Sequence, residues 1–236
     1  MLLAAGLGTR LKPFTNQYPK ALATVNGKSL LQRNILYLQQ AGIKKVVVNV
    51  HHFASQIINA MEENNGWGSE IIISDETDAV LETGGGLKKA ATHLQHYKNF
   101  VLMNTDVLTD MNLNNMISFH ETKNVLATLA VTQRKTSRYF LFDENDNLCG
   151  WKNIKTGEKK PAQLLEENLR EKAFSGIHVI NSEIFSLMQR NGKFSMVDVY
   201  LDLMDNYNIK CFDHSDSNFI DVGKPESIAE AEMLFE

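Results

Sequence analysis

Cysteine is scarce in this sequence, and its scarcity excludes two kinds of architecture. The 236 residues contain two cysteines, Cys149 and Cys211. Two cysteines so far apart form neither a disulfide framework nor the closely spaced ligand set of a structural metal site. The composition is therefore typical of a reducing compartment, and we expect a cytoplasmic protein.

Long apolar runs and an excess of positive charge are missing as well. No apolar stretch approaches the ~20 residues of a membrane-spanning helix, and the opening MLLAAG is too short for the apolar part of a signal peptide. Lysine and arginine number 24 against 28 aspartates and glutamates, a net charge of -4. We therefore expect neither a membrane nor a nucleic acid as partner. Small anionic substrates need only a local cluster of cations and stay open.

Short apolar runs alternate along the chain with segments of helical periodicity. Buried strands are predicted at 44–50, 70–74, 100–104, 125–131, 176–180 and 218–222. Helices are predicted around 30–38, 57–61 and 197–204, and over 225–234. This alternation predicts a Rossmann-like α/β fold, in which a doubly wound, mixed, mostly parallel sheet carries helices on both faces. The first apolar stretch is short for a strand, which is typical of a trimmed or misassigned chain start.

The alternation breaks between about 132 and 172. The segment RYFLFDENDNLCGW (138–151) is typical of a β-hairpin with a polar turn, and KTGEKKPAQ (155–163) of a loop. We expect a small hairpin lobe or lid attached to a single domain over 1–236.

The segment LLAAGLGTRLKPFTNQYPKAL (2–22) places two glycines after an apolar run and two cations soon after them. Backbone N–H groups of such a loop form an anion-binding concavity. A dinucleotide loop needs a third glycine where this chain has Leu11, and a P-loop needs Gly-Lys followed by Ser or Thr, so neither standard loop fits. Arg10 and Lys20 suit a triphosphate, which arginine binds bidentately and lysine as a point charge. A tight turn followed by a solvated basic loop is the alternative.

The same segment resembles the signature of the sugar-1-phosphate nucleotidylyltransferases, G-x-G-T-R-(L/M)-x-P-x-T-x-x-x-P-K, and matches each of its fixed positions. The resemblance implies that a nucleoside triphosphate and a sugar 1-phosphate are the substrates. It also implies that Arg10 and Lys20 are catalytic and contact the nucleotide phosphates and the incoming sugar phosphate. The nucleotide-binding residues that it implies in this loop are Ala5, Gly6, Gly8, Thr9 and Arg10.

Two aspartates stand at the carboxyl ends of predicted strands. Asp106 ends VLMNTD, and Asp221 ends NFID just before a glycine and a helix that starts with proline. Each aspartate alone is equally typical of a helix N-cap. The two carboxylates together with phosphate oxygens and water suit the octahedral oxygen shell of Mg²⁺. Both motifs also resemble the metal ligands of the family, so we assign Asp106 and Asp221 to Mg²⁺, Asp106 to catalysis as well, and Asn104 to nucleotide binding.

The segment LETGGGLKKA (81–90) places three glycines at the start of a predicted helix. A plain strand-to-helix loop is one interpretation. The family binds its nucleobase and ribose against this loop, which implies base contacts from Glu82, Thr83 and Gly84. The form L-E-T-G-G-G is similar to uridylyltransferases that act on N-acetylmuramic acid 1-phosphate, whereas many relatives carry G-T in place of Glu82 and Thr83.

The resemblance covers roughly 1–131 and 173–236 and weakens between them. Members that use N-acetylglucosamine 1-phosphate carry Glu where this chain has Asn153, and Asn-Thr-Gly where it has Phe-Ser-Gly (174–176). Muramic-acid relatives carry F-A-G there. The expected sugar-phosphate residues are Lys20, Asn153 and Gly176. The resemblance thus implies a nucleotide-binding part over about 1–131 and a sugar-binding part with a lid over about 132–236.

The function expected from these features is transfer of a nucleotidyl group to a sugar 1-phosphate with release of pyrophosphate. UTP with N-acetylmuramic acid 1-phosphate, a reaction of peptidoglycan recycling, is the favoured pair. Mannose or glucose 1-phosphate with GTP, dTTP or UTP, and phosphocholine with CTP, stay open, as does a non-catalytic nucleotide-sensing subunit. The missing third glycine disfavours a dehydrogenase. The sequence leaves the choice between a monomer and a homodimer open.

Overall fold

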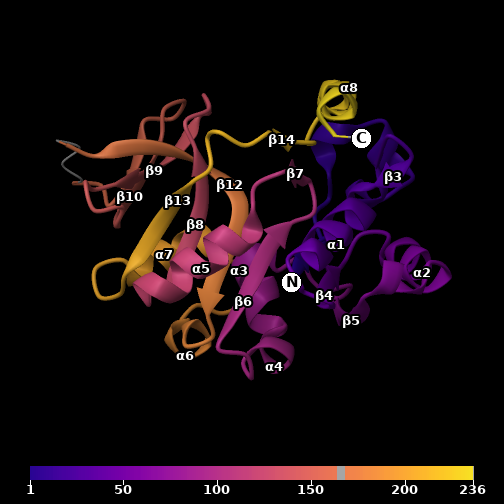
Figure 1. Ribbon diagram of the computed structural model, residues 1–236, viewed down its shortest axis with the longest axis horizontal. Helices are drawn as coiled ribbons and strands as arrows, with labels where there is room; N and C mark the ends of the chain where they lie inside the picture. The colour runs from indigo at the N-terminus through magenta and orange to yellow at the C-terminus, as the bar shows by residue number, and fades with distance from the viewer. Residues whose placement is uncertain (164–167, 236) are drawn as a thin grey trace.

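A mixed β-sheet forms the centre of the molecule (Figure 1). The computed structural model describes residues 1–163 and 168–235. Within them the large sheet has the order β11-β10-β9-β12-β6-β1-β4-β5, and β8 pairs with β12 and with β13. These strands are β1 (Leu2–Leu3), β4 (Lys45–Val50), β5 (Glu70–Asp75), β6 (Asn99–Asn104), β8 (Ala127–Thr132), β9 (Arg138–Phe142), β10 (Leu148–Asn153), β11 (Glu158–Lys160), β12 (Arg170–Asn181) and β13 (Ile209–Asp213).

The sheet is parallel in the half that holds the amino-terminal motif. Strands β5, β4, β1 and β6 run parallel, so that Leu2 lies beside both Val48 and Met103. Strand β12 runs antiparallel to β6, β8 and β9, while β13 and β8 are parallel. The α/β fold with a mixed central sheet predicted from the strand–helix alternation is confirmed.

Helices cover both faces of this sheet, because successive strand residues point to opposite sides. On β4, Val46 and Val48 belong to one apolar cluster, and Val47 belongs to the other. The cluster around Val46 takes in α1 (Leu30–Gln40), α2 (Ala54–Glu63) and α5 (Leu113–Lys123). The cluster around Val47 takes in α3 (Glu82–Lys89), α4 (Ala91–Leu94), α6 (Ile184–Leu187) and α7 (Met196–Leu203).

The carboxyl-terminal segment returns to the amino-terminal motif. Strand β14 (Phe219–Asp221) pairs with β7 (Val107–Thr109) in a separate two-stranded sheet, and α8 (Pro225–Leu234) follows it. A third apolar cluster joins α8 and β14 to the loop after β1, with Leu11, Val25, Ile220 and Val222 buried in it. Figure 1 accordingly shows the carboxyl terminus beside β3 (Lys28–Ser29), which forms a two-stranded sheet with β2 (Thr24–Val25).

Most of the predicted elements are present, while other elements, such as helix α5, were not predicted. The run 218–222 does form a strand, but it lies outside the central sheet. The hairpin over 138–151 is confirmed as β9 and β10, whereas part of the loop predicted at 155–163 is strand β11. Strand β13 escaped prediction because its IKCFD mixes charged with apolar residues, so no continuous apolar run marks it.

Candidate active site

The glycine-containing loop leads from β1 into short 3-10 turns. These turns are η1 (Thr9–Leu11), η2 (Phe14–Asn16) and η3 (Lys20–Leu22); a fourth, η4 (Asn65–Gly68), lies elsewhere. Gly8 has a φ of 62°, and a Cβ atom there would lie 2.8 Å from Thr15 Cγ2 and 3.0 Å from Lys20 Cβ. A Cβ at Gly6 would meet nothing within 4 Å. The absence of a side chain at Gly8 lets the loop and Lys20 approach closely, while the backbone at Gly6 faces open space.

The two cations of this motif meet the two predicted metal ligands. The Lys20 ammonium forms a direct ion pair with Asp106, and its Nζ lies 3.9 Å from Asp221 Oδ1. Arg10 Nη2 lies 3.7 Å from Asp221 Oδ2. The side chains of Lys20 and Asp106 are 13% and 24% exposed. Four residues that are up to 211 positions apart, from Arg10 to Asp221, thus share one site.

The small β7–β14 sheet explains how Asp221 reaches Asp106. Asp221 pairs with Val107, the residue after Asp106, and the N–H of Val222 donates to the carbonyl of Asp106 at 2.8 Å. Gly223 leaves room for the arginine, because a Cβ there would lie 2.8 Å from Arg10 Nη2. The backbone ladder therefore fixes the spacing of the two carboxylates.

The charges of the site act on Asp221 in opposite directions. Burial and the nearby carboxylate of Asp106 raise the pKa of Asp221, and the positive charges of Lys20, Arg10 and Arg134 partly offset that rise. Two carboxylates that repel each other form an electrostatic site for a divalent cation. No group of three or more His, Cys, Asp or Glu side chains in 1–163 and 168–235 is arranged to hold a metal ion. A cation here would need further oxygen atoms from water or substrate, which fits the habit of Mg²⁺.

A cleft of about 370 Å³ opens beside this cluster. Seven residues predicted from the sequence line it: Ala5, Gly6, Lys20, Glu82, Thr83, Asn104 and Asp106. Thr9 is exposed at the start of η1, outside this lining. A cleft with the Lys20 ammonium in its lining and a glycine-containing backbone along its wall suits an elongated, phosphorylated ligand.

The loop that opens α3 is hydrogen-bonded to the segment before α7. The N–H of Gly84 donates to Phe194 O at 2.9 Å, and Thr83 Oγ1 accepts from the N–H of Met196 at 2.9 Å. Glu82 has a φ of 59° and lies 3.5 Å from the ammonium of Lys193. The Gly84 N–H is thus already bonded within the protein, and the side chains of Glu82 and Thr83 remain along the cleft.

A buried, hydrogen-bonded pair, Asn49 and Glu76, lies behind the glycine-containing loop and was not predicted from the sequence. Asn49 Oδ1 accepts from the N–H of Ala4 at 2.7 Å and of Ala5 at 3.3 Å, and Asn49 Nδ2 donates to Glu76 Oε1 at 2.8 Å. Burial raises the pKa of Glu76, which is 1% exposed. A Cβ at Gly86 would lie 2.6 Å from Glu76 Oε1. The signal in the sequence was the lone asparagine within the apolar run KKVVVNV.

The predicted sugar-phosphate residues are distributed over two strands. Gly176 on β12 has a φ of 75°, and a Cβ there would lie 2.8 Å from Asn104 Nδ2, so these two predicted residues adjoin. Asn153 lies on β10, which is separated from β12 by β9. Its side-chain oxygen accepts from the N–H of Lys155 at 3.0 Å within a local turn.

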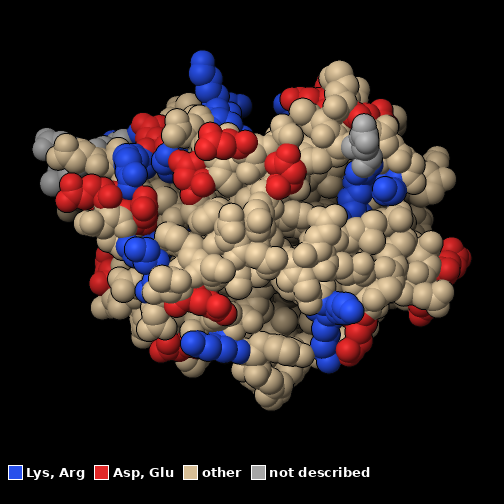
Figure 2. Space-filling model, viewed as in Figure 1, with Lys and Arg blue, Asp and Glu red and all other residues tan. Residues whose placement is uncertain are grey.

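The face shown in Figure 2 carries side chains of both charges. Acidic and basic side chains of the described residues alternate around the edge of that face, without a continuous basic patch. Across the part of the chain that the structure describes, no helix is both long and apolar enough to cross a membrane.

The chain belongs to the nucleotidyl transferase family, whose sequence pattern matches residues 1–236. It is 28% identical over 237 residues to a UTP–glucose-1-phosphate uridylyltransferase of Synechocystis, covering 95% of this chain and 60% of that protein. It is 46% identical over 103 residues to an N-acetylmuramate alpha-1-phosphate uridylyltransferase of Caulobacter vibrioides, covering 43% of each chain. The chain thus spans less than two thirds of the length of these curated relatives.

A solved structure of HddC from Yersinia pseudotuberculosis complexed with GMP-PN has a similar fold. The TM-score is 0.78 at 22% identity, and the match covers 100% of this chain and 98% of that one. A putative glucose-1-phosphate thymidylyltransferase from Bacillus anthracis matches with a TM-score of 0.83 at 15% identity, over 99% of this chain and 93% of that one. At these sequence identities, the two matches show that the fold of this chain is similar to theirs.

Proposed function

We propose that this protein is a sugar-1-phosphate nucleotidylyltransferase that joins a nucleoside triphosphate to a sugar 1-phosphate. The observation that carries the proposal is the cluster of Arg10, Lys20, Asp106 and Asp221 at the end of a cleft lined by Gly6. A protein that only bound nucleotide would not need this whole set of cations and carboxylates. Membership of the nucleotidyl transferase family supports the same chemistry.

In the proposed reaction, a phosphate oxygen of the sugar 1-phosphate attacks the α-phosphorus of the nucleoside triphosphate. One P–O bond forms, the bond between the α-phosphorus and its bridging oxygen to the β-phosphate breaks, and pyrophosphate leaves. The nucleophile is already ionised near neutral pH, so no general base is required. The difficulty is the approach of two anions, and catalysis consists of positioning and charge neutralisation.

Each cation has a proposed role in this neutralisation. Lys20 binds the attacking phosphate and stabilises the negative charge that develops in the transition state. Its side chain is 13% exposed, so water screens the ammonium poorly. Arg10, which is 59% exposed, binds the triphosphate from the solvent side of the loop. Backbone N–H groups around Gly6 and Gly8 supply further donors to the phosphates.

Asp106 and Asp221 would hold Mg²⁺, to which their paired carboxylates are suited. When bound, the ion neutralises phosphate charge and polarises the phosphorus. Without it, Lys20 balances the charge of Asp106, which keeps both side chains facing the substrate cleft.

UTP with N-acetylmuramic acid 1-phosphate is the proposed substrate pair, and the reaction would serve peptidoglycan recycling in the cytoplasm. The support is the L-E-T-G-G-G form at 81–86, the Phe-Ser-Gly at 174–176, and the likeness to two N-acetylmuramate alpha-1-phosphate uridylyltransferases. The first shares 46% identity over 103 residues and the second, from Neisseria meningitidis, 39% over 111. We assign nucleotide binding to about 1–131 and sugar binding to about 132–236, with Asn104, Asn153 and Gly176 near their boundary.

The testing experiment measures pyrophosphate release with Mg²⁺ for four nucleoside triphosphates crossed with a panel of acceptors. The acceptors are the 1-phosphates of N-acetylmuramic acid, N-acetylglucosamine, glucose and mannose, together with phosphocholine. Release confined to UTP and N-acetylmuramic acid 1-phosphate supports the full proposal. Release with another pair, such as GTP and the mannose 1-phosphate named in a Drosophila relative 28% identical over 240 residues, would retain the reaction and replace the substrate. No pyrophosphate release with any pair, from a protein that is folded, would favour a nucleotide-sensing subunit.

A further inference from the structure

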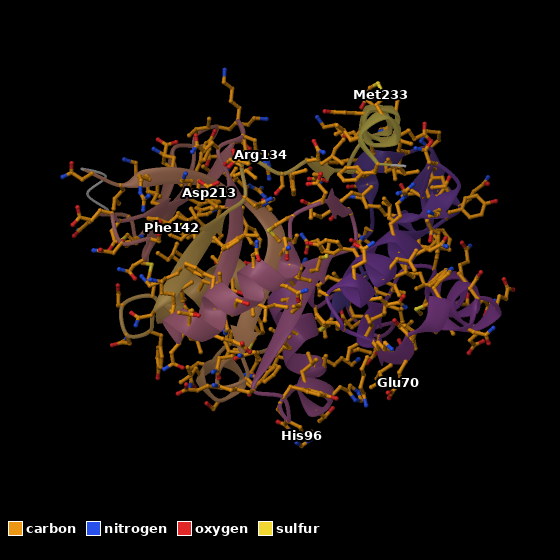
Figure 3. The ribbon with its side chains drawn as sticks, in the orientation of Figure 1. Glu70, His96, Arg134, Phe142, Asp213 and Met233 are labelled. Atoms are coloured by element: carbon orange, nitrogen blue, oxygen red, sulfur yellow. The ribbon has the colours of Figure 1, made fainter. Side chains whose placement is uncertain are left out.

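Arg134 occupies a defined place next to the candidate active site that its role in the fold does not explain. It follows β8, at the upper edge of the sheet in Figure 3, beside the connection from β13 to β14. Its guanidinium contacts Phe174, two residues before Gly176, and the ring of Phe219, two residues before Asp221. The residue therefore lies on the sugar side of the site, near the strand that holds Gly176.

Two contacts hold the guanidinium of Arg134 in place. Arg134 Nη2 donates to Phe174 O at 2.7 Å, two residues before Gly176. Arg134 Cζ lies 5.0 Å from the centroid of the Phe219 ring, a cation–π arrangement. The register of β12 against β8 shifts between Phe174 and His178. A rigidly held guanidinium loses little entropy when it binds a ligand.

The hydrogen bonding around this guanidinium is incomplete. Among the described residues, Arg134 Nε, Thr132 Oγ1 and His214 Nδ1 are buried and have no hydrogen-bond partner. His214 itself is fixed, because its Nε2 shares a hydrogen bond of 2.7 Å with Ser175 Oγ. Buried polar atoms are nearly always bonded in native proteins. The N–H of His214 donates to Val131 O at 3.0 Å, which brings His214 to the end of the strand that leads through Thr132 to Arg134. These unbonded atoms indicate a place that a polar ligand completes.

Arg134 also differs from several other cations in its pairing. Lys20 pairs with Asp106, Arg10 with Asp221, Lys172 with Asp213, and Lys160 with Asp198. No carboxylate in 1–163 or 168–235 forms an ion pair with Arg134. Burying a charge without a counterion is costly, so the site favours an incoming anion.

We propose that Arg134 binds an oxyanion of the sugar substrate, and specifically the carboxylate of an acidic sugar 1-phosphate. The inference rests on the proposed function and deepens it. N-acetylmuramic acid differs from N-acetylglucosamine by a lactyl ether that ends in a carboxylate. Arg134 has a planar fork of donors suited to a carboxylate, and the phosphates already have Arg10 and Lys20. Arg134 is thus the residue that selects the acidic sugar.

The experiment uses the full chain with UTP, Mg²⁺ and either N-acetylmuramic acid 1-phosphate or N-acetylglucosamine 1-phosphate. Arg134→Gln removes the charge, Arg134→Lys keeps it, and Lys135→Gln changes the exposed neighbouring cation as a control. Loss of a charged hydrogen bond predicts a KM for the muramic substrate about 10- to 100-fold higher in Arg134→Gln. The KM for UTP stays within about threefold, and turnover of the glucosamine substrate, however low, stays at the level of the original chain. Arg134→Lys recovers part of the loss, and Lys135→Gln matches the original chain.

A second arm needs no variant and covers the case in which Arg134→Gln does not fold. The unaltered protein is titrated with UDP-N-acetylmuramic acid and with the analogue whose lactyl carboxylate is a carboxamide, and binding is followed by the rise in Tm. The carboxamide is expected to bind about 10- to 100-fold more weakly.

Four outcomes overturn the inference. Equal losses for both sugars would assign the guanidinium to the shared phosphate. Unchanged kinetics in Arg134→Gln, or equal binding of acid and amide, would show that Arg134 has no role in substrate binding. Absence of turnover and binding with both sugars in the unaltered protein would refute the proposed substrate, and with it the inference.

Discussion

Gly8 and Gly6 lie two residues apart in one loop, yet replacing each by alanine has different expected results. At Gly8 the φ of 62° is a conformation that alanine adopts only with strain, and the new Cβ would stand 2.8 Å from Thr15 Cγ2. At Gly6 the new Cβ would meet no atom within 4 Å. The first position is thus constrained by the fold, and the second is open toward the proposed ligand.

The expected loss of stability in Gly8→Ala has two parts. The left-handed conformation costs an L-residue about 1–2 kcal/mol, and inserting a methyl group into a packed place costs about 1–3 kcal/mol. We expect a loss of roughly 2–5 kcal/mol in the free energy of unfolding, which corresponds to about 4–20 °C in Tm for a chain of this size. Turnover should fall too, since Lys20 Cβ is 3.0 Å from the new atom and has to move.

Gly6→Ala is the matched control for stability and the test of the loop's function. Without substrate its free energy of unfolding should stay within about 0.5 kcal/mol of the original. With substrate, the methyl group enters the space proposed for the phosphates, so the KM for the nucleoside triphosphate should rise. Urea unfolding and initial rates of pyrophosphate release measure the two effects separately.

Two results would refute this reasoning. If Gly8→Ala and Gly6→Ala unfolded at the same urea concentration, the steric argument would be wrong. If Gly6→Ala kept the original KM for every nucleoside triphosphate, the loop would not hold the phosphates as proposed.

Three further predictions concern one carboxylate of the site and two polar pairs of the fold. Asp106→Asn should lower the rate of pyrophosphate release at least ~100-fold, about 3 kcal/mol, while thermal unfolding stays cooperative; a rate near that of the original chain would remove Asp106 from catalysis. Tyr200→Phe leaves the buried His178 Nδ1 without its 2.6 Å partner, so urea unfolding should show a loss of about 1–3 kcal/mol, and an unchanged midpoint would contradict the pairing. Burial raises the pKa of Asp213, but the hydrogen bonds from Lys172 and Ser215 and the charge of Lys172 together outweigh burial, and the pKa falls to about 2. Because that pKa is lower in the folded state, the ionised form stabilises the protein above about pH 4. At 35% exposure the pair is partly screened by water, so Asp213→Asn should cost about 1 kcal/mol at pH 7. The difference should shrink as the pH falls toward 2, and a difference that grew would reverse the assignment.

The sequence predicted the parts of the site that depend on neighbouring residues. The spacing from Gly6 to Lys20 set the phosphate loop, because turn geometry and close backbone approach are local properties. Apolar runs ending in Asn104 and Asp106 predicted a strand with polar residues at its carboxyl end, and the structure has β6 there with both residues along the cleft. The buried runs of β4 and β5 were equally plain, since a strand covered on both faces needs continuous apolar residues.

Features that join distant segments could not be predicted. The pairing of β7 with β14, which brings Asp221 beside Asp106, depends on a backbone ladder in which Asp221 pairs with Val107, 114 positions earlier in the chain. The hydrogen-bonded pair of Asn49 and Glu76 behind the loop could not be predicted, because a single buried polar contact gives no periodic pattern in the sequence. Strand β11 replaced a predicted loop for a similar reason, since GEKKP gains its strand conformation only by pairing with β10.

The sequence by itself thus determined the groups from which the proposed chemistry is argued: a glycine-containing loop, two cations and two carboxylates of the types that phosphoryl chemistry uses. Tertiary structure alone decided how these groups face one another, and it alone left Arg134 with no ion-pair partner among the described residues, near Ser175 and His214. The reason is physical. Residue types and short spacings fix what each group can bind, whereas distances between groups depend on packing and on hydrogen bonds between strands far apart in the chain.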